Sequence, residues 1–215
     1  MATLLCTVIG DLVGSRAVPD RSAVQRSLGA ALEEVNRLLA PAQPFEPTVG
    51  DEFQGACDTL PDAVLAALLV RLRLLPEIDS RCGLGFGPVT VHDASRRPLL
   101  QDGPGWWAAR SAIDVLGEHP ARRTWFAVAD QAPADAPDPG AVNAFLTCRD
   151  QIIGRLNDRG AQMLRLALSG RSQKQIAEEL EVWPSAVSQQ FARGIGVVVD
   201  AQATFAGPVT APGDR

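Results

Sequence analysis

The sequence predicts an α+β protein in which a sheet-and-helix sandwich precedes an all-helical domain. In the first 130 residues, segments with strand and helix periodicity alternate as strand, helix, hairpin, helix, strand, helix and strand. A stretch rich in Pro and Asp, residues 131–140, then interrupts the pattern, and only helical periodicity follows up to about residue 200. The order of the first part is that of a ferredoxin-like sandwich with additions, in which helices cover one face of an antiparallel sheet.

The first half of the sandwich is predicted from apolar runs and their interruptions. Residues 3–10 form an apolar run typical of a buried strand. A helix is expected from about residue 20 or 22, because apolar residues recur at helical spacing at Val24, Leu28, Leu32, Val35 and Leu39. Prolines end this helix, and residues 45–49 and 53–57 are predicted as two short strands joined at the acidic turn Gly50–Asp51.

The second half is predicted as helix 62–75, strand 81–91, helix 106–116 and strand 122–129. Gly83, Gly85 and Gly87 alternate along the first of these strands and leave one face bare, so another backbone or a ligand is expected close to it. The predicted domain boundaries are 1–130 for the sandwich, 131–140 for the linker, 141–207 for the helical domain and 208–215 for a disordered tail.

Composition and charge exclude several classes of protein. The chain has 215 residues and a formal net charge of −5, which does not suit a protein that coats nucleic acid non-specifically. Four cysteines without paired spacing and two histidines argue against a zinc site. No signal-peptide pattern is present, and no segment reaches the roughly 20 apolar residues that span a bilayer. We therefore expect a cytoplasmic protein that does not enter a membrane.

Two acidic loops, each next to a predicted strand, indicate a metal and phosphate site. Mg²⁺, or Mn²⁺ in its place, binds through one or two carboxylates together with phosphate oxygens. The residues expected to hold the metal are Asp11, Asp51 and Glu52. Loop N–H groups and arginine side chains suit the phosphates of a purine nucleotide. The residues expected to bind that nucleotide are Leu12, Val13, Gly14, Ser15, Arg16 and Arg110.

The residues alone leave other roles open for these side chains. Asp11 could cap the loop after its strand, and Asp51 could be an ordinary hairpin residue. Glu52 could point to solvent, and Arg16 and Arg110 could be plain surface arginines.

These segments resemble two families of nucleotide-using enzymes. Ile9–Ser15 resembles the first metal-binding loop of class III nucleotidyl cyclases, and Arg81–Val89 resembles a cyclase strand. Gly50–Phe53 is similar to the signature hairpin of GGDEF diguanylate cyclases, with Val49 in place of the first glycine. Ala108–Arg110 matches the end of a cyclase segment that carries an Asn and an Arg one helical turn apart. Over nearly its whole length the chain resembles the SatD family, which implies a cyclase-like domain fused to a helix-turn-helix.

The chain departs from the cyclase pattern at the nucleotide-binding helix. Trp106 stands four residues before Arg110, where cyclases carry the Asn that binds ribose. Trp106 and Trp107 either stack on a base or fill the core. The single lysine, Lys174, lies in the other domain, so no lysine is available to read a purine. These departures favour nucleotide binding without cyclase chemistry.

Residues 158–196 have the pattern of a helix-turn-helix. The run Ser172–Leu180, a short turn, and Ser185–Ser188 resemble the DNA-reading modules of MarR, LuxR and sigma-factor proteins. Contacts to double-stranded DNA are expected from Arg171, Lys174, Ser185, Ser188, Gln189, Gln190 and Arg193. Residues 149–196 hold seven basic and five acidic side chains, which is a small excess for tight binding by a monomer. A homodimer is therefore expected on DNA, and a protein-contact surface is the alternative.

The sequence thus predicts a transcription regulator whose cyclase-like domain binds a nucleotide and a divalent metal and controls a DNA-binding helix-turn-helix. An active nucleotidyl cyclase or nucleotidyl transferase is the first alternative. A protein-interaction adaptor is a weaker one.

Overall fold

The computed structural model describes residues 2–206, and the disordered tail expected at 208–215 lies outside them. Contacts between Cα atoms divide the chain into two compact units, Met1–Gly154 and Arg155–Arg215. Helix α4 (Pro139–Ile153) packs against strand β6 (Thr124–Val128) and so belongs to the first unit. The stretch expected as a linker, 131–140, therefore lies within that unit and includes the start of α4.

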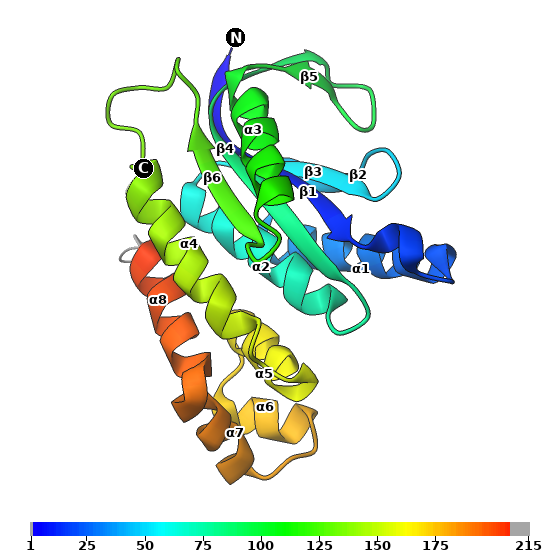
Figure 1. Ribbon diagram of the computed structural model, residues 1–215, viewed down its shortest axis with the longest axis vertical. Helices are drawn as coiled ribbons and strands as arrows, with labels where there is room; N and C mark the ends of the chain where they lie inside the picture. Colours follow the sequence, from blue (N-terminus) through cyan, green and yellow to red (C-terminus); the bar gives the residue numbers. More distant parts are fainter. Residues whose placement is uncertain (1, 207–215) are drawn as a thin grey trace. The chain divides into compact units, whose positions relative to one another are not determined.

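A mixed sheet forms the centre of the first unit (Figure 1). Within residues 2–206, its strands are β2 (Gln43–Pro47), β3 (Glu52–Cys57), β1 (Thr3–Val13), β4 (Asp79–Asp93) and β5 (Leu100–Asp102), which neighbour one another in that order. These neighbours are antiparallel, and β6 pairs in parallel with the first half of β4. The prediction of a fully antiparallel sheet was wrong, because β6 pairs with β4 in parallel. Strand β5 was not predicted from the sequence.

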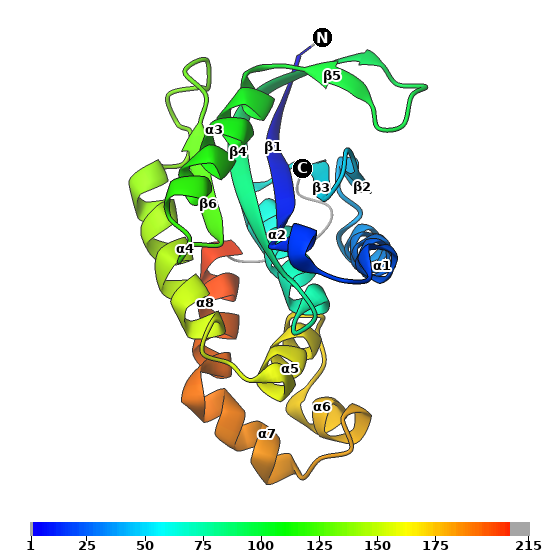
Figure 2. The ribbon, with the colours of Figure 1, turned by 45° about the vertical axis from the view of Figure 1, so that its right-hand side comes forward.

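Helices cover both faces of the sheet, which corrects the expectation of helices on one face. Helices α1 (Arg21–Leu39) and α2 (Leu60–Leu74) lie on one side, and α3 (Pro104–Glu118) lies on the other (Figure 2). The second face can accept a helix because Gly83 and Gly85 of β4 leave it without side chains where α3 packs. A chain that runs from one strand to a parallel neighbour must cross over the sheet, and here the crossover contains α3.

The alternating glycines of β4 allow α3 to lie unusually close to the sheet. A Cβ atom at Gly83 would collide with the backbone oxygen of Ala109, and one at Gly85 would collide with the backbone oxygen of Gly105. Thr7 of β1 also links the sheet to α3, because its hydroxyl donates to the carbonyl oxygen of Gly105 at 2.8 Å. The sequence predicted that either another backbone or a ligand lies close to this glycine-rich face, and the structure shows the backbone of α3 there.

The second unit is helical through its described residues. Its elements are α5 (Asp158–Leu168), α6 (Gln173–Glu179), α7 (Pro184–Gln190), the π-helical turn η2 (Phe191–Ile195) and α8 (Gly196–Ala206). Ser172 and Gln175 form a capping box that starts α6, and Pro184 occupies the first turn of α7. Helix α7 ends at Gln190 and is followed by η2, in which Gly194 has a φ of 145° and breaks the helical geometry, so Arg193 lies in η2 and not in α7. None of the helices in residues 2–206 is long and apolar enough to cross a membrane.

Candidate functional site

Three charged residues form a row across the centre of the sheet. Asp11 of β1 is directly opposite Glu52 of β3 on one side and directly opposite Arg81 of β4 on the other. Residues directly opposite each other on neighbouring strands project from the same face. Alternation along β1 puts this row on the face that also carries Ile9 and Thr7, which is the face covered by α3.

Asp11 and Arg81 form a two-pronged ion pair within the sheet. The Nε atom of Arg81 donates to Oδ1 of Asp11 at 2.7 Å, and Nη2 donates to Oδ2 at 2.8 Å. The hydrogen bond to Asp11 raises the pKa of Arg81 above its usual value; burial opposes this rise, and the charges of Asp11 and Asp51 add to it. Arg81 therefore interacts electrostatically with both of the aspartates that the sequence analysis selected.

Glu52 forms a second pair of the same kind with Arg110 of α3. The distances from Nη2 and Nη1 of Arg110 to the two carboxylate oxygens are 3.0 and 3.2 Å. The hydrogen bond to Glu52 raises the pKa of Arg110; burial opposes this, and the charges of Glu52, Asp114 and Asp11 support it. The second pair joins α3 to the sheet, whereas the first joins two strands.

Asp51 is held at the hairpin turn by the loop that follows β1. Gly50 has a φ of 70°, a conformation that glycine adopts without a steric penalty, and this turns the chain sharply. The buried hydroxyl of Ser15 donates to Oδ2 of Asp51, and Nε2 of Gln25 donates to the carbonyl oxygen of Gly50 at 2.7 Å. The two acidic loops predicted from the sequence are thus joined directly.

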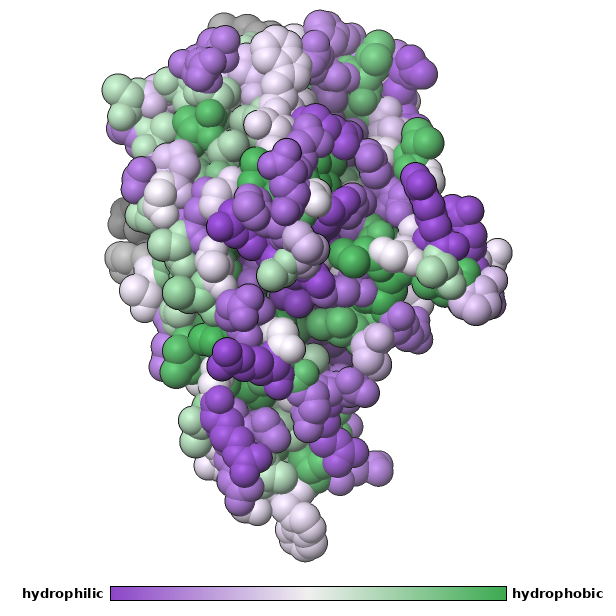
Figure 3. Space-filling view, viewed as in Figure 1, coloured by the Kyte–Doolittle hydropathy of each residue, from purple (hydrophilic) through white to green (hydrophobic). Residues whose placement is uncertain are grey.

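The residues expected to bind phosphate separate into two groups. Leu12 and Val13 lie inside β1, opposite Ser80 and Asp79 of β4, and Leu12 is buried. Gly14, Ser15 and Arg16 lie beyond the strand, in a loop and the short 3₁₀ turn η1 (Ser15–Ala17). Arg16 and Arg110 are exposed and Arg81 is half-buried, and all three are cationic side chains near the acidic loops. Hydrophilic residues cover much of the face that carries α3 (Figure 3).

Arg81 is the residue that the sequence analysis did not assign to the site. Its segment was noted only for its resemblance to a cyclase strand. The signal that would have identified Arg81 is the strand register, because pairing β1 with β4 puts Arg81 opposite Asp11.

The two tryptophans at the start of α3 have different surroundings. Trp106 is 8% exposed and packs in the core between α3 and the sheet, beside Leu5 and Ile9. Trp107 is 57% exposed, and its Nε1 donates to Oδ1 of Asp102 at 2.7 Å. Core filling therefore describes Trp106, and Trp107 is the one with an accessible ring.

The acidic residues suit a metal ion only if a ligand completes its coordination. Among the described residues, no three His, Cys, Asp or Glu side chains are grouped so that they could hold a metal by themselves. Mg²⁺ commonly takes one or two carboxylates from the protein and its other ligands from phosphate and water. Both oxygens of Asp11 accept from Arg81, both oxygens of Glu52 accept from Arg110, and Oδ2 of Asp51 accepts from Ser15.

The residues expected to bind DNA lie mostly on the surface of the second unit. Ser185, Ser188 and Gln189 of α7 are exposed, and Gln190 is half-buried. Arg193 is exposed in η2. Arg171 and Lys174 are also exposed, but each lies near a glutamate, at 3.6 Å from Glu179 and 3.9 Å from Glu178.

The mixed sheet and its helices on both faces define a mixed α/β protein. The chain belongs to the SatD family, which matches residues 5–203. No curated protein matches this chain.

Two solved structures of a bacterial light-regulated adenylyl cyclase are similar to part of the chain. In the first, identity is 12% and the TM-score is 0.42, and the match covers 59% of this chain and 44% of that one. In the second, identity is 10% and the TM-score is 0.44, with coverage of 59% and 76%. The match thus spans less than half the length of the first cyclase, and both likenesses concern the fold.

Proposed function

We propose that this protein is a nucleotide-responsive transcription regulator. In this proposal the first unit binds a purine nucleotide together with Mg²⁺ or Mn²⁺, and its occupancy changes how a cytoplasmic homodimer binds double-stranded DNA through the second unit. The observation that carries the proposal is the pairing of Asp11 with Arg81 and of Glu52 with Arg110 beside Asp51.

The ion pairs have the properties of groups that can change partners. Arg81 and Asp11 side chains are 31% and 19% exposed, and those of Arg110 and Glu52 are 49% and 36% exposed. The more exposed pair, Arg110 with Glu52, contributes about 0–1 kcal/mol to stability, so separating it costs little. A metal–nucleotide complex carries both a cation and anionic phosphates. It can therefore replace both partners of each pair at once, the metal at the carboxylates and the phosphates at the arginines.

Specific residues have separate roles in this proposal. Asp11 and Asp51 would hold the metal, which neutralises phosphate charge when bound. Arg81, Arg110 and Arg16 would contact the phosphates, and Ser15 positions Asp51. Gly14, Ser15 and Arg16 are the loop residues whose N–H groups support phosphate binding, since Leu12 and Val13 are strand residues.

The second unit supports DNA binding through the surface of α7. Serine and glutamine side chains are suited to base edges and phosphates, and Ser185, Ser188 and Gln189 are all exposed. The glutamates near Arg171 and Lys174 reduce the local positive charge. Two copies of α7 on a dimer would compensate for that weak charge.

A panel of purine nucleoside triphosphates, each with and without Mg²⁺, tests the first half of the proposal. Binding to the native state raises the Tm. We expect a Mg²⁺-dependent rise for the wild type and for the control Asp135→Asn, whose side chain is exposed in a loop. Asp11→Asn should abolish the rise, because it removes a negatively charged ligand. An unchanged Tm for the wild type with every nucleotide would refute nucleotide binding.

Selection from a pool of random-sequence DNA duplexes tests the second half. We expect the full-length protein to enrich a two-fold symmetric site and the nucleotide to change its Kd. Gln189→Ala should weaken that binding without altering the nucleotide-induced rise in Tm. If no duplex is enriched with or without nucleotide, the DNA-binding role is refuted.

If the triphosphate is instead consumed when it is incubated with the protein, and the product is lost in Asp51→Ala, the chain is an enzyme of the cyclase or transferase type.

A further inference from the structure

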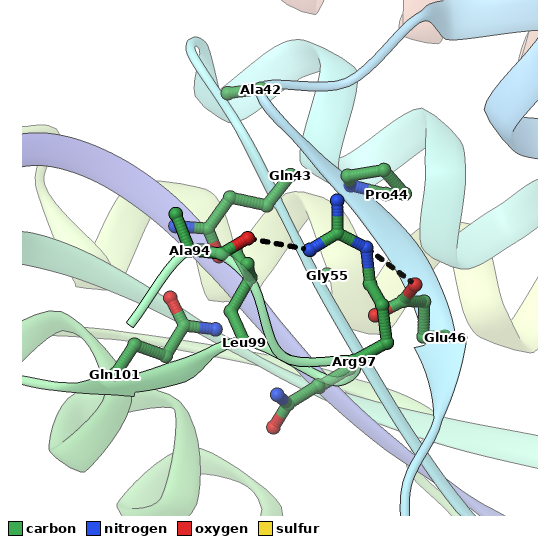
Figure 4. Close-up of a pocket in the computed structure, with 10 residues that line it drawn as sticks. Ala42, Gln43, Pro44, Glu46, Gly55, Ala94, Arg97, Leu99 and Gln101 are labelled. Carbon is green, nitrogen blue, oxygen red and sulfur yellow. Dashed lines mark hydrogen bonds and ion pairs between the residues drawn. The ribbon is translucent and has the colours of Figure 1, made fainter. Parts of the chain in front are cut away.

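A small polar pocket lies between the β2–β3 hairpin and the chain that connects β4 to β5. It encloses about 190 Å³, and Figure 4 shows its side chains. The polar residues that line it are Gln43, Glu46, Gln54, Arg97 and Gln101.

Two of these glutamines have a buried oxygen without a hydrogen-bond partner. Gln43 is only 7% exposed, and its Oε1 has no donor among the described residues. Oε1 of Gln101 is buried and unpartnered in the same way. Leaving a buried acceptor unsatisfied is costly, so such groups in native proteins normally accept a hydrogen bond from protein, water or ligand. The pocket therefore presents two acceptors to a ligand that supplies N–H or O–H donors.

The far wall of the pocket is fixed by Arg97. Its Nε lies 3.7 Å from Oε1 of Glu46, and its Nη1 donates to the carbonyl oxygen of Ala94 at 3.0 Å (Figure 4). The contact with Glu46 links the β4–β5 connection to β2, and Gln43 of β2 and Gln101 of β5 both line the cavity between these segments.

The pocket adjoins the charged row on the same face of the sheet. Gln54 is opposite Ile9, and Glu52 is opposite Asp11. Glu52 and Gln54 are two residues apart on β3, so their side chains share one face and are separated by about 7 Å along the strand. A ligand with phosphates at Arg110, beside Glu52, can thus extend a second group toward Gln54.

We infer that this pocket binds the base of the nucleotide and selects bases that carry an exocyclic amino group. The inference rests on the proposed function. An amino group supplies the donors that the Gln43 and Gln101 oxygens lack, and glutamine is well suited to pair with a base edge. A base with a carbonyl group in place of the amino group would put its oxygen, an acceptor, next to the Oε1 atoms of Gln43 and Gln101. Such a base would bind more weakly.

Matched ligands test the inference directly. ATP and GTP each carry an amino group that ITP lacks, and CTP carries one where UTP has an oxygen. With Mg²⁺ present, we expect the wild type to bind at least one amino-bearing triphosphate about tenfold more tightly than its partner, since one hydrogen bond contributes about 1.4 kcal/mol. Gln43→Met and Gln101→Met should each reduce that ratio to about twofold or less. Both should leave the Kd for inorganic tripolyphosphate unchanged.

The control and the contrary outcomes separate this inference from the proposed function. Gln162→Met changes an exposed glutamine of α5 in the other unit and should leave the ratio intact. Equal affinities within every pair for the wild type, or an unchanged ratio in both methionine variants, would overturn the pocket inference while tripolyphosphate binding still supports the site. If neither the nucleotides nor tripolyphosphate bind, both proposals fail. Gln101→Met keeps the test valid if Gln43→Met does not fold, because Gln101 is less buried.

Discussion

The first unit contains two ionic clusters that differ in burial and in what they connect. One is the charged row of Asp11, Arg81 and Glu52 together with Arg110 of α3, which pairs with Glu52. The other joins α2, β4, β6 and α4, where Asp79 accepts from Arg71 at 2.8 Å and from Arg123 at 2.6 Å, and Asp150 accepts from Arg149 at 3.1 Å. Both side chains of the Arg149–Asp150 pair are 2% exposed.

The difference in burial assigns different roles to the two clusters. A buried ion pair is costly to desolvate, and removing one partner leaves an uncompensated charge in the interior. The buried cluster is therefore fixed and belongs to the framework. The Glu52–Arg110 pair of the other cluster is half-exposed, so water can replace either partner and a charged ligand can compete for both.

Asp150→Asn is expected to give the largest effect on stability. It leaves the buried guanidinium of Arg149 without its carboxylate and weakens the attraction to Arg71, whose Nη1 lies 3.8 Å from Asp150. We expect a loss of about 3–5 kcal/mol in the free energy of unfolding, measured by urea denaturation. Glu178→Gln, which removes an exposed partner of Lys174, is the matched control and should cost less than about 1 kcal/mol. Equal losses in the two variants would remove the distinction between the clusters.

Gly85→Ala should be less damaging to stability but should separate the two pairs of the charged row. The new Cβ would collide with the backbone of α3 and push the helix outward, at a cost of about 1–3 kcal/mol. Arg110 would move away from Glu52, whereas Asp11 and Arg81 are both on strands and should stay paired. Gly29→Ala in α1 has free space around the new Cβ and should stabilise slightly. Urea denaturation would measure the free energy of unfolding of both variants. A crystal structure of Gly85→Ala would show whether Arg110 has moved away from Glu52 while Asp11 and Arg81 stay paired.

The stability of the buried cluster should depend on acidic pH. Burial raises the pKa of Asp79, but hydrogen bonds and charges from Arg71 and Arg123 outweigh it, so the pKa is lowered overall. A depressed pKa in the folded state stabilises the protein above the unfolded pKa of about 3.9, and this contribution is lost as the pH falls through the folded value. We expect Asp79→Asn to be less stable than the wild type at neutral pH and the gap to narrow as the pH falls below about 4. If the difference in stability between Asp79→Asn and the wild type stays constant as the pH falls below about 4, Asp79 does not have a lowered pKa in the folded state.

Arg110→Gln should have the smallest effect on the free energy of unfolding, below about 1 kcal/mol, because the pair with Glu52 is substantially exposed. The same variant should weaken the binding of Mg²⁺–nucleotide, since a phosphate contact is lost. A large loss of stability with unchanged nucleotide binding would place this pair in the framework instead.

Local patterns predicted most elements of the fold, because each depends on residues close in the sequence. The strands at 3–10 and 81–91 and the helix from about 20 were found through apolar runs and helical spacing, and they correspond to β1, β4 and α1. β5 was missed because three residues carry too little periodicity. The parallel pairing of β6 depends on a crossover between distant segments, and no local pattern encodes it.

Of the candidate site, the sequence indicated only the residues that belong to local patterns. Asp11, Asp51 and Glu52 could be selected from adjacent turns and strands, and Arg110 from its motif. Their partners depend on register and on helix position: Arg81 meets Asp11 only because β1 and β4 pair as they do. The pocket of Gln43 and Gln101 is formed by residues far apart in the sequence, and neither residue has a distinctive local pattern.

One buried amide at the outer edge of β6 limits how this protein can associate with itself. Asn143 of α4 accepts from the N–H of Phe126 and donates to its carbonyl oxygen, both at 2.8 Å. An incoming strand would have to displace both bonds, and natural proteins block exposed sheet edges by similar means to avoid uncontrolled polymerisation. An extended β-ladder between two copies at β6 is therefore disfavoured.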